Sequence, residues 1–278
     1  MIVADLERFF LIAAIFLHGA SAIALIIGVV FAGERWQSSG QALLWAGFLS
    51  CTALIAVHWQ LVGHGPYISR YEVLLSNVWV ATAAYLGAVR LWPGLRAMGM
   101  LVVPLILLGM GAASLSSAAP VFLSPAQRST WLIIHVCFAK LTTGAILLGT
   151  GLALSVLLRA RPGLERFSFL QRLPDPDRSD LLGYKMMVCA FLFASMMIAS
   201  GSIWGHQLRQ SYWDWDPLET WSLILWLVYG LYLHLRITFN FRGRKSAWFV
   251  IGAFVVTIFT FFLLPYLADT WHNAYMTN

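Results

Sequence analysis

Charged residues are scarce in this sequence. Asp, Glu, Lys and Arg make up 11% of its 278 residues, against about 25% in a typical soluble domain. Apolar residues make up 60%, and the mean hydropathy is +0.75. This composition excludes an ordinary water-soluble domain. The net charge of +6 does not indicate nucleic-acid binding, because the basic residues lie in short segments between apolar runs.

Cysteine is also scarce, and it lacks the spacing of a metal or redox site. Cys51, Cys137 and Cys189 all fall inside apolar runs with no CxxC pattern, so each is interpreted as a small core residue. A cleavable signal peptide is not predicted. The first apolar run, 9–31, is too long for one and lacks a basic start.

Long apolar runs dominate what is present. A helix needs about 20 mostly apolar residues to cross a bilayer. We find no internal repeat and no separate soluble region, so we expect an all-α, polytopic membrane protein with a single domain over 1–278. Eight runs predict eight spans: 9–31, 41–62, 71–92, 97–117, 130–158, 184–203, 221–239 and 248–268.

Basic residues predict the orientation, because short cytoplasmic loops are enriched in Lys and Arg. If the N-terminus is outside, the inner segments hold 13 basic residues and the outer segments 4. Both termini are therefore expected on the outer (periplasmic or lumenal) side, with one sizeable inner basic loop at 159–183. The 13 inner residues are Arg35, Arg90, Arg96, Arg159, Arg161, Arg166, Arg172, Arg178, Lys185, Arg236, Arg242, Arg244 and Lys245.

Three short motifs predict helix starts at outer ends of spans. Asp216-Pro-Leu-Glu219 places an acceptor at the N-cap, Pro at the first helical position and Glu three residues after the cap. Ser124-Pro-Ala-Gln127 repeats the scheme, and Ser69-Arg-Tyr-Glu72 is a version without Pro. We expect these capping boxes before the seventh, fifth and third spans. A structural role therefore already accounts for Asp216 and Glu219.

The outer loop predicted at 202–221 is unusually rich in tryptophan. Five tryptophans fall within 23 residues between Trp204 and Trp226. Trp and Tyr gather at membrane interfaces, which accounts for some of them but not for Trp213-Asp-Trp215-Asp in one short loop. Flat aromatic side chains there can form a surface for a large planar apolar ligand such as haem.

The motif YWDWDPLETW followed by LYLHLR resembles the WWD signature of haem-handling membrane proteins, in the CcsA/ResC form of System II cytochrome c synthesis. Three further segments are similar to the same family in order: GHGPYISRYEVLLSNVW (63–79), WLIIHV (131–136) and WHNAY (271–275). The resemblance covers roughly 63–275. The chain departs from the family pattern at Arg209-Gln210, where Trp-Gly is usual, and at Leu218, where Lys is common.

The resemblance implies iron ligands outside the tryptophan loop. His135, about 7 Å into the fifth span, and His272 after the eighth match the outer haem ligands. His234, roughly 20 Å along the helix from Trp221, matches a ligand of a second, intramembrane haem. The cofactor-binding residues predicted around them are Trp204, Arg209, Tyr212, Trp213, Trp215, Asp216 and Trp221.

The roles of several other ionisable residues are less defined by the sequence. Arg209 can pair bidentately with a haem propionate. Lys140 can snorkel outward or meet a propionate. His18 is either a hydrogen-bonded structural residue or the second intramembrane ligand. An interfacial position suffices for His58, His64 and His206.

The function implied by the resemblance is that of a cytochrome c synthase subunit. Such a subunit moves haem b to the outer face and presents it for thioether attachment to the CxxCH motif of apocytochrome c. It is a lyase acting with a CcsB/ResB-like partner and a thiol-reducing thioredoxin-like protein, in a bacterial inner membrane or a thylakoid membrane. No residue of the chain is an evident catalytic nucleophile. The alternatives are a haem exporter or chaperone without ligase activity, and an electron-transfer subunit with b-type haem between buried histidines.

Overall fold

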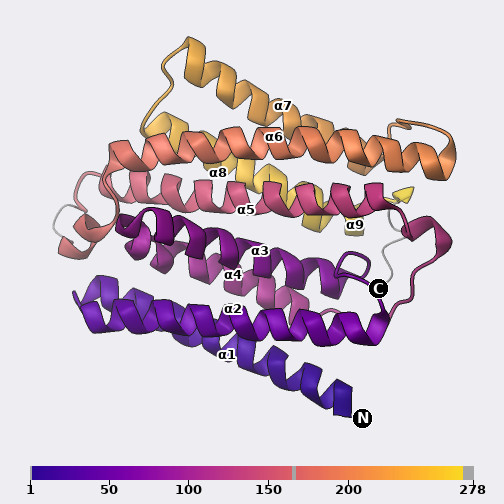
Figure 1. The fold of residues 1–278 in the computed structure, drawn as a ribbon. Helices are drawn as coiled ribbons and strands as arrows, with labels where there is room; N and C mark the ends of the chain where they lie inside the picture. The colour runs from indigo at the N-terminus through magenta and orange to yellow at the C-terminus, as the bar shows by residue number, and fades with distance from the viewer. Residues whose placement is uncertain (1, 165–166, 272–278) are drawn as a thin grey trace.

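The computed structural model describes residues 2–164 and 167–271, and over these ranges it contains helices and loops but no strand (Figure 1). Eight spans in the described residues are long and apolar enough to cross a membrane, which confirms the all-α, polytopic prediction. The spans are α1 (Ile2–Val30), α2 (Glu34–Val62), α3 (Arg70–Leu91), η1 (Pro93–Met98) continuing into α4 (Gly99–Ser114), α5 (Thr130–Arg159), α6 (Pro176–Arg209), α7 (Pro217–Thr238), and α8 (Arg244–Ile258) with η4 (Phe259–Leu263) and α9 (Leu264–Leu267).

The helices lie side by side in one bundle, with α1 and α7 at opposite sides of it (Figure 1). Helix α5 is the most buried span and packs against α3, α6 and α8. The start of α1, the end of α9 and the connection from α6 to α7 lie at the same end of the bundle. We call this the tryptophan end; by the charge distribution it is predicted to be the outer one.

Two connections are shorter than the sequence indicates. Helix α6 continues to Arg209 and α7 begins at Pro217, so the connecting segment, here called the tryptophan loop, is only 210–216. At the opposite end α5 stops at Arg159 and α6 begins at Pro176, and the one-turn helix η3 (Ser168–Arg172) lies between them. The apolar pattern underestimates the lengths of α6 and α7, because their polar end turns continue the helix beyond the apolar residues.

The three predicted helix starts have different outcomes. Ser69 and Glu72 form the expected capping box at α3, and Asp216 caps α7 by accepting from the N–H of Leu218. Ser124 and Gln127 also form a capping box, but it opens the one-turn helix η2 (Pro125–Gln127). Helix α5 starts later, at Thr130, with Ser129 as its N-cap. The motif was therefore recognised correctly but assigned to the wrong helix.

His18 is a structural residue of the bundle. Its ring is fully buried, with Nδ1 2.8 Å from the carbonyl oxygen of Ala14 and Nε2 3.2 Å from Thr82 Oγ1. Both ring nitrogens are occupied, and α1 lies across the bundle from α7, which carries His234 (Figure 1). The pairing of His18 with His234 around one haem is therefore wrong for this chain. The three cysteines are free thiols, but only Cys51 is the buried core residue that was expected: Cys137 is exposed and Cys189 is half-buried.

Candidate functional site

A cavity opens at the tryptophan end between α3, α5, α6, the start of α7 and the segment before α9. Its wall is largely apolar. Several side chains in the wall belong to the predicted site or carry charge: His135, Lys140, Trp204, Tyr212, Trp213 and Glu219. Trp271 also lines the cavity. The structure therefore brings together residues that are up to 204 positions apart in the sequence, from Tyr67 to Trp271.

His135 has the geometry of a preorganised metal ligand. Its Nδ1 lies 2.8 Å from the backbone carbonyl oxygen of Met197 on α6. A carbonyl only accepts, so Nδ1 carries the hydrogen and the lone pair of the neutral ring is on Nε2. Ligating histidines commonly donate their other ring N–H to a backbone carbonyl in this way. Gly201 makes the approach possible, because a Cβ there would lie 2.5 Å from His135 Nδ1.

Aromatic rings form the wall beside His135. Trp204 is buried, and its ring centroid lies 6.4 Å from that of His135 and 5.2 Å from that of Trp271. Trp213 is half-buried, and its Nε1 has no hydrogen-bond partner within the described residues. Tyr212 is exposed and stacks on His206 at 4.1 Å, which leaves His206 outside the wall. These faces and edges suit a flat apolar ligand.

An ion-pair network shapes the tryptophan loop. The Arg209 guanidinium donates to Asp214 and, over 3.0 Å, to Glu219. It also lies 4.0 Å from the centre of the Trp271 ring. Glu219 accepts in addition from the backbone N–H of Asp214 at 2.9 Å. A propionate at Arg209 would have to compete with these two carboxylates, and no local sequence pattern indicated that Arg209 would pair with them.

Asp216 joins the loop to the C-terminal segment. One carboxylate oxygen accepts from the N–H of Leu218 at 2.9 Å, so Asp216 is the predicted N-cap, but Glu219 accepts from the N–H of Asp214 in place of the predicted capping box. The other accepts from the N–H of Trp271 at 2.9 Å. Asp216 therefore positions Trp271, a cavity residue that sequence reasoning missed although it precedes the predicted ligand His272. His272 itself lies outside the described residues.

Three predicted residues lie away from the cavity. Trp215 is 69% exposed and adopts a left-handed backbone conformation at φ +57°, which is rare for a bulky residue. Trp221 packs edge-on against Phe259 at 4.6 Å. His234 is exposed on α7, next to Thr238 and Phe239. The His234 imidazole therefore lies on the exposed surface of α7, where a second protein can reach it, and it does not line the cavity.

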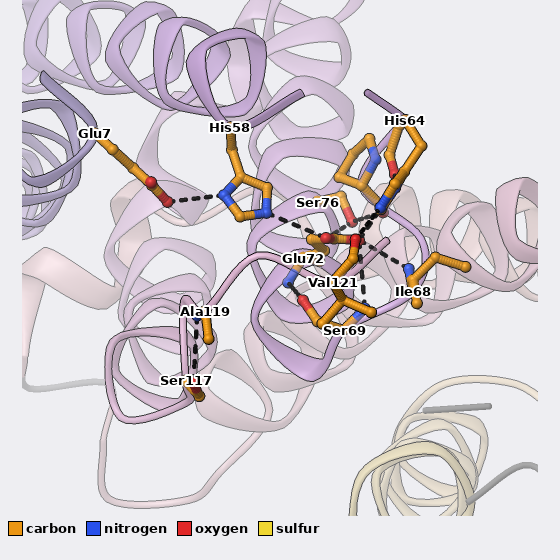
Figure 2. Close-up of polar contacts among 12 residues, drawn as sticks. Glu7, His58, His64, Ile68, Ser69, Glu72, Ser76, Ser117, Ala119 and Val121 are labelled. Carbon is orange, nitrogen blue, oxygen red and sulfur yellow. Dashed lines mark hydrogen bonds and ion pairs between the residues drawn. The ribbon is translucent and has the colours of Figure 1, made fainter. Parts of the chain in front are cut away.

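Glu72 holds the connection between α2 and α3 that forms another part of the cavity wall (Figure 2). It is 1% exposed and accepts from the N–H groups of Ile68 at 2.9 Å and Ser69 at 3.3 Å. Tyr67 and Ile68 in this connection line the cavity. Burial, and then the nearby Glu72 charge, raises the pKa of the Tyr67 hydroxyl, so this ring is neutral.

His58 and His64 are more than interfacial residues. The His58 ring joins Glu7 at 2.9 Å to Glu72 at 3.1 Å, and all three are buried (Figure 2). His64 Nδ1 lies 2.8 Å from the carbonyl oxygen of Gly65 and Nε2 lies 2.7 Å from that of Val121, so the ring ties the α2–α3 connection to the segment before η2. The signal that could have indicated this cluster is the set of ionisable residues at the ends of three neighbouring spans.

Several known proteins are similar to this chain in sequence. Residues 67–272 match the cytochrome c assembly protein family. The cytochrome c biogenesis protein CcsA of Parasynechococcus marenigrum is 34% identical over 260 residues, covering 80% of this chain and 84% of that protein. CcsA of Synechococcus sp. CC9902 is 33% identical over 76% of this chain and 78% of its own length. CcsA of Chlamydomonas reinhardtii is 31% identical, with 79% and 64% covered.

The fold also has a solved relative. The structure titled cytochrome c haem lyase CcmF superposes with a TM-score of 0.73 at 18% identity, over 94% of this chain and 47% of that one. This likeness concerns the fold alone, and the chain spans about half of that protein.

The chain belongs to the cytochrome c assembly protein family, an integral membrane family of cytochrome c biogenesis. Within it, the chain is of the CcsA type.

Proposed function

We propose that this protein receives haem b as a substrate and presents it at the tryptophan end for covalent attachment to apocytochrome c. The observation that supports this most directly is His135. It lies in an aromatic cavity, and its Nδ1 donates to Met197, which directs the ring's lone pair to Nε2. His272 supplies the second iron ligand in this proposal, and Trp271, its neighbour, already lines the cavity.

The chain's contribution is positioning. Trp204, Trp213 and Trp271 cover the haem, and the loop network holds them in place. In thioether formation the client's thiol adds across a haem vinyl group: a sulfur–carbon bond forms and the thiol hydrogen passes to the vinyl group. This addition requires no nucleophile from the chain. Holding the thiol and the vinyl group next to each other lowers the entropic cost of bringing them together.

The partner in this proposal is a CcsB/ResB-like membrane protein, because His234 is exposed on α7 and needs a second ligand from outside the bundle. A thioredoxin-like protein keeps the client thiols reduced. The membrane is a bacterial inner membrane or a thylakoid membrane, with the tryptophan end facing outward.

The test is co-expression with such a partner and a reporter apocytochrome, using His135→Gly and, as a matched control, His206→Gly. We expect His135→Gly to lose most of the haem bound to the purified protein and most covalent haem on the reporter. Added imidazole should restore both, because it fits the space of the missing ring. His206→Gly makes the same change nearby, off the cavity wall, and should leave both near wild type.

The outcomes separate the alternatives. Haem on the protein without covalent haem on the reporter would indicate delivery rather than attachment. Full haem retention by His135→Gly would refute the ligand assignment.

A further inference from the structure

Lys140 lies in the cavity wall on α5, five residues beyond His135. Its side chain is 8% exposed, so it does not snorkel to the surface, which was one of the two alternatives open from the sequence. Its Nζ is inaccessible to solvent and has no hydrogen-bond partner among the residues that the structure describes.

A buried ammonium without a partner is costly, by several kcal/mol. In membrane proteins such groups face the bundle interior and mark binding sites or pathways. Two acidic residues are candidates for a protein counter-ion, Glu219 in the lining of the same cavity and Glu72, whose charge acts on Lys140, and both are committed elsewhere. Glu219 is bound by Arg209, and Glu72 by His58 and the N–H of Ile68. A ligand anion is therefore the partner that Lys140 lacks.

The position of Lys140 relative to His135 indicates which way the anionic edge of the ligand points. Helix α5 begins at Thr130 at the tryptophan end, so Lys140 lies about 7.5 Å deeper in the bundle than His135. Tyr212 and Trp213 line the same cavity from the tryptophan loop, at its opposite end. A flat ligand with an acidic edge and an apolar edge fits this arrangement with the acidic edge inward.

We propose that Lys140 binds a carboxylate of the porphyrin, so that the propionate edge of haem points into the bundle and the vinyl edge toward the tryptophan loop. This inference rests on the proposed function and specifies how haem is oriented there. It assigns the propionate to Lys140 and leaves Arg209 to hold the loop carboxylates.

The test compares two porphyrins that differ only at the acidic edge. Purified protein in detergent is titrated with haemin and with haemin dimethyl ester, and binding is followed by quenching of tryptophan fluorescence. We expect the wild type to prefer the acid about tenfold or more, as for a hydrogen bond to a charged group. Lys140→Met should remove this preference with little change in ester affinity, and Lys140→Arg should keep it. Lys245→Met, at an exposed lysine of α8, is the matched control and should keep it too.

Two results overturn the inference while the proposed function stands: equal affinity of the wild type for acid and ester, or an unchanged preference in Lys140→Met. The first needs no variant, so a folding defect cannot obscure it. Failure of the wild type to bind either porphyrin overturns the proposed function and this inference together.

Discussion

The backbone N–H of Trp271 donates to a carboxylate oxygen of Asp216 over 2.9 Å, 55 residues away in the sequence. The same carboxylate caps α7 through the N–H of Leu218. One buried side chain thus orders the seventh helix and the segment that leads to the predicted ligand His272.

Substitution of Asp216 should separate these two roles. Asp216→Ala loses the cap and the contact to Trp271, and we expect a loss of about 1–2 kcal/mol in unfolding free energy from the cap alone. Asp216→Asn keeps an N-cap of similar quality but can turn its NH2 toward the Trp271 N–H. We expect Asn to preserve thermal stability while reducing haem affinity. Equal affinity in wild type and Asp216→Asn would contradict the positioning role.

Gly201→Ala should displace the His135 ring, which Gly201 faces in the cavity wall. A Cβ there would lie 2.5 Å from His135 Nδ1, so the ring has to move away from the carbonyl of Met197. We expect at least a tenfold loss of haem affinity, measured by Soret titration. Gly252→Ala is the matched control, because its Cβ would meet no atom within 4 Å. The prediction is wrong if both variants bind haem equally.

Glu72→Gln should destabilise the bundle and loosen the cavity wall. The buried cluster of Glu7, His58 and Glu72 loses one of its two carboxylates, and buried hydrogen bonds to a charged group contribute about 1.5–3 kcal/mol. We expect a large fall in the thermal unfolding midpoint in detergent. Glu34→Gln, at an exposed acid that begins α2, should have almost no effect. A double variant with His58→Gln that is no less stable than Glu72→Gln would verify the coupling, and additive losses would argue against it.

His234→Ala should leave haem binding by the isolated chain unchanged, because the side chain is exposed on α7 and away from the cavity. In co-expression with the proposed partner we expect a clear loss of haem content. Thr238→Ala, which removes only the hydroxyl beside the imidazole, is the control. Reduced haem in the isolated His234→Ala protein would place this residue at the first site instead.

Much of the architecture follows from local sequence properties. Apolar runs predicted all eight spans, because each crosses lipid and is apolar over its own length. Asp216 and Ser69 were recognised as helix caps because capping is a contact within four residues. The helix ends were less accurate: polar turns extend α6 to Arg209, beyond the apolar pattern.

The site depended on contacts that no local pattern contains. The sequence by itself determined the membrane helices, the tryptophan-rich segment and the candidacy of His135. Only the tertiary structure decided that Trp271 faces the cavity, that Trp221 packs against Phe259, and that α1, which carries His18, lies across the bundle from α7, which carries His234. It also decided that Arg209 has carboxylate partners whereas Lys140 has no hydrogen-bond partner among the described residues. The reason is physical: a residue's type and neighbours in sequence determine which helix it joins, but its counter-ion and its place in a cavity depend on helices that pack from distant parts of the chain.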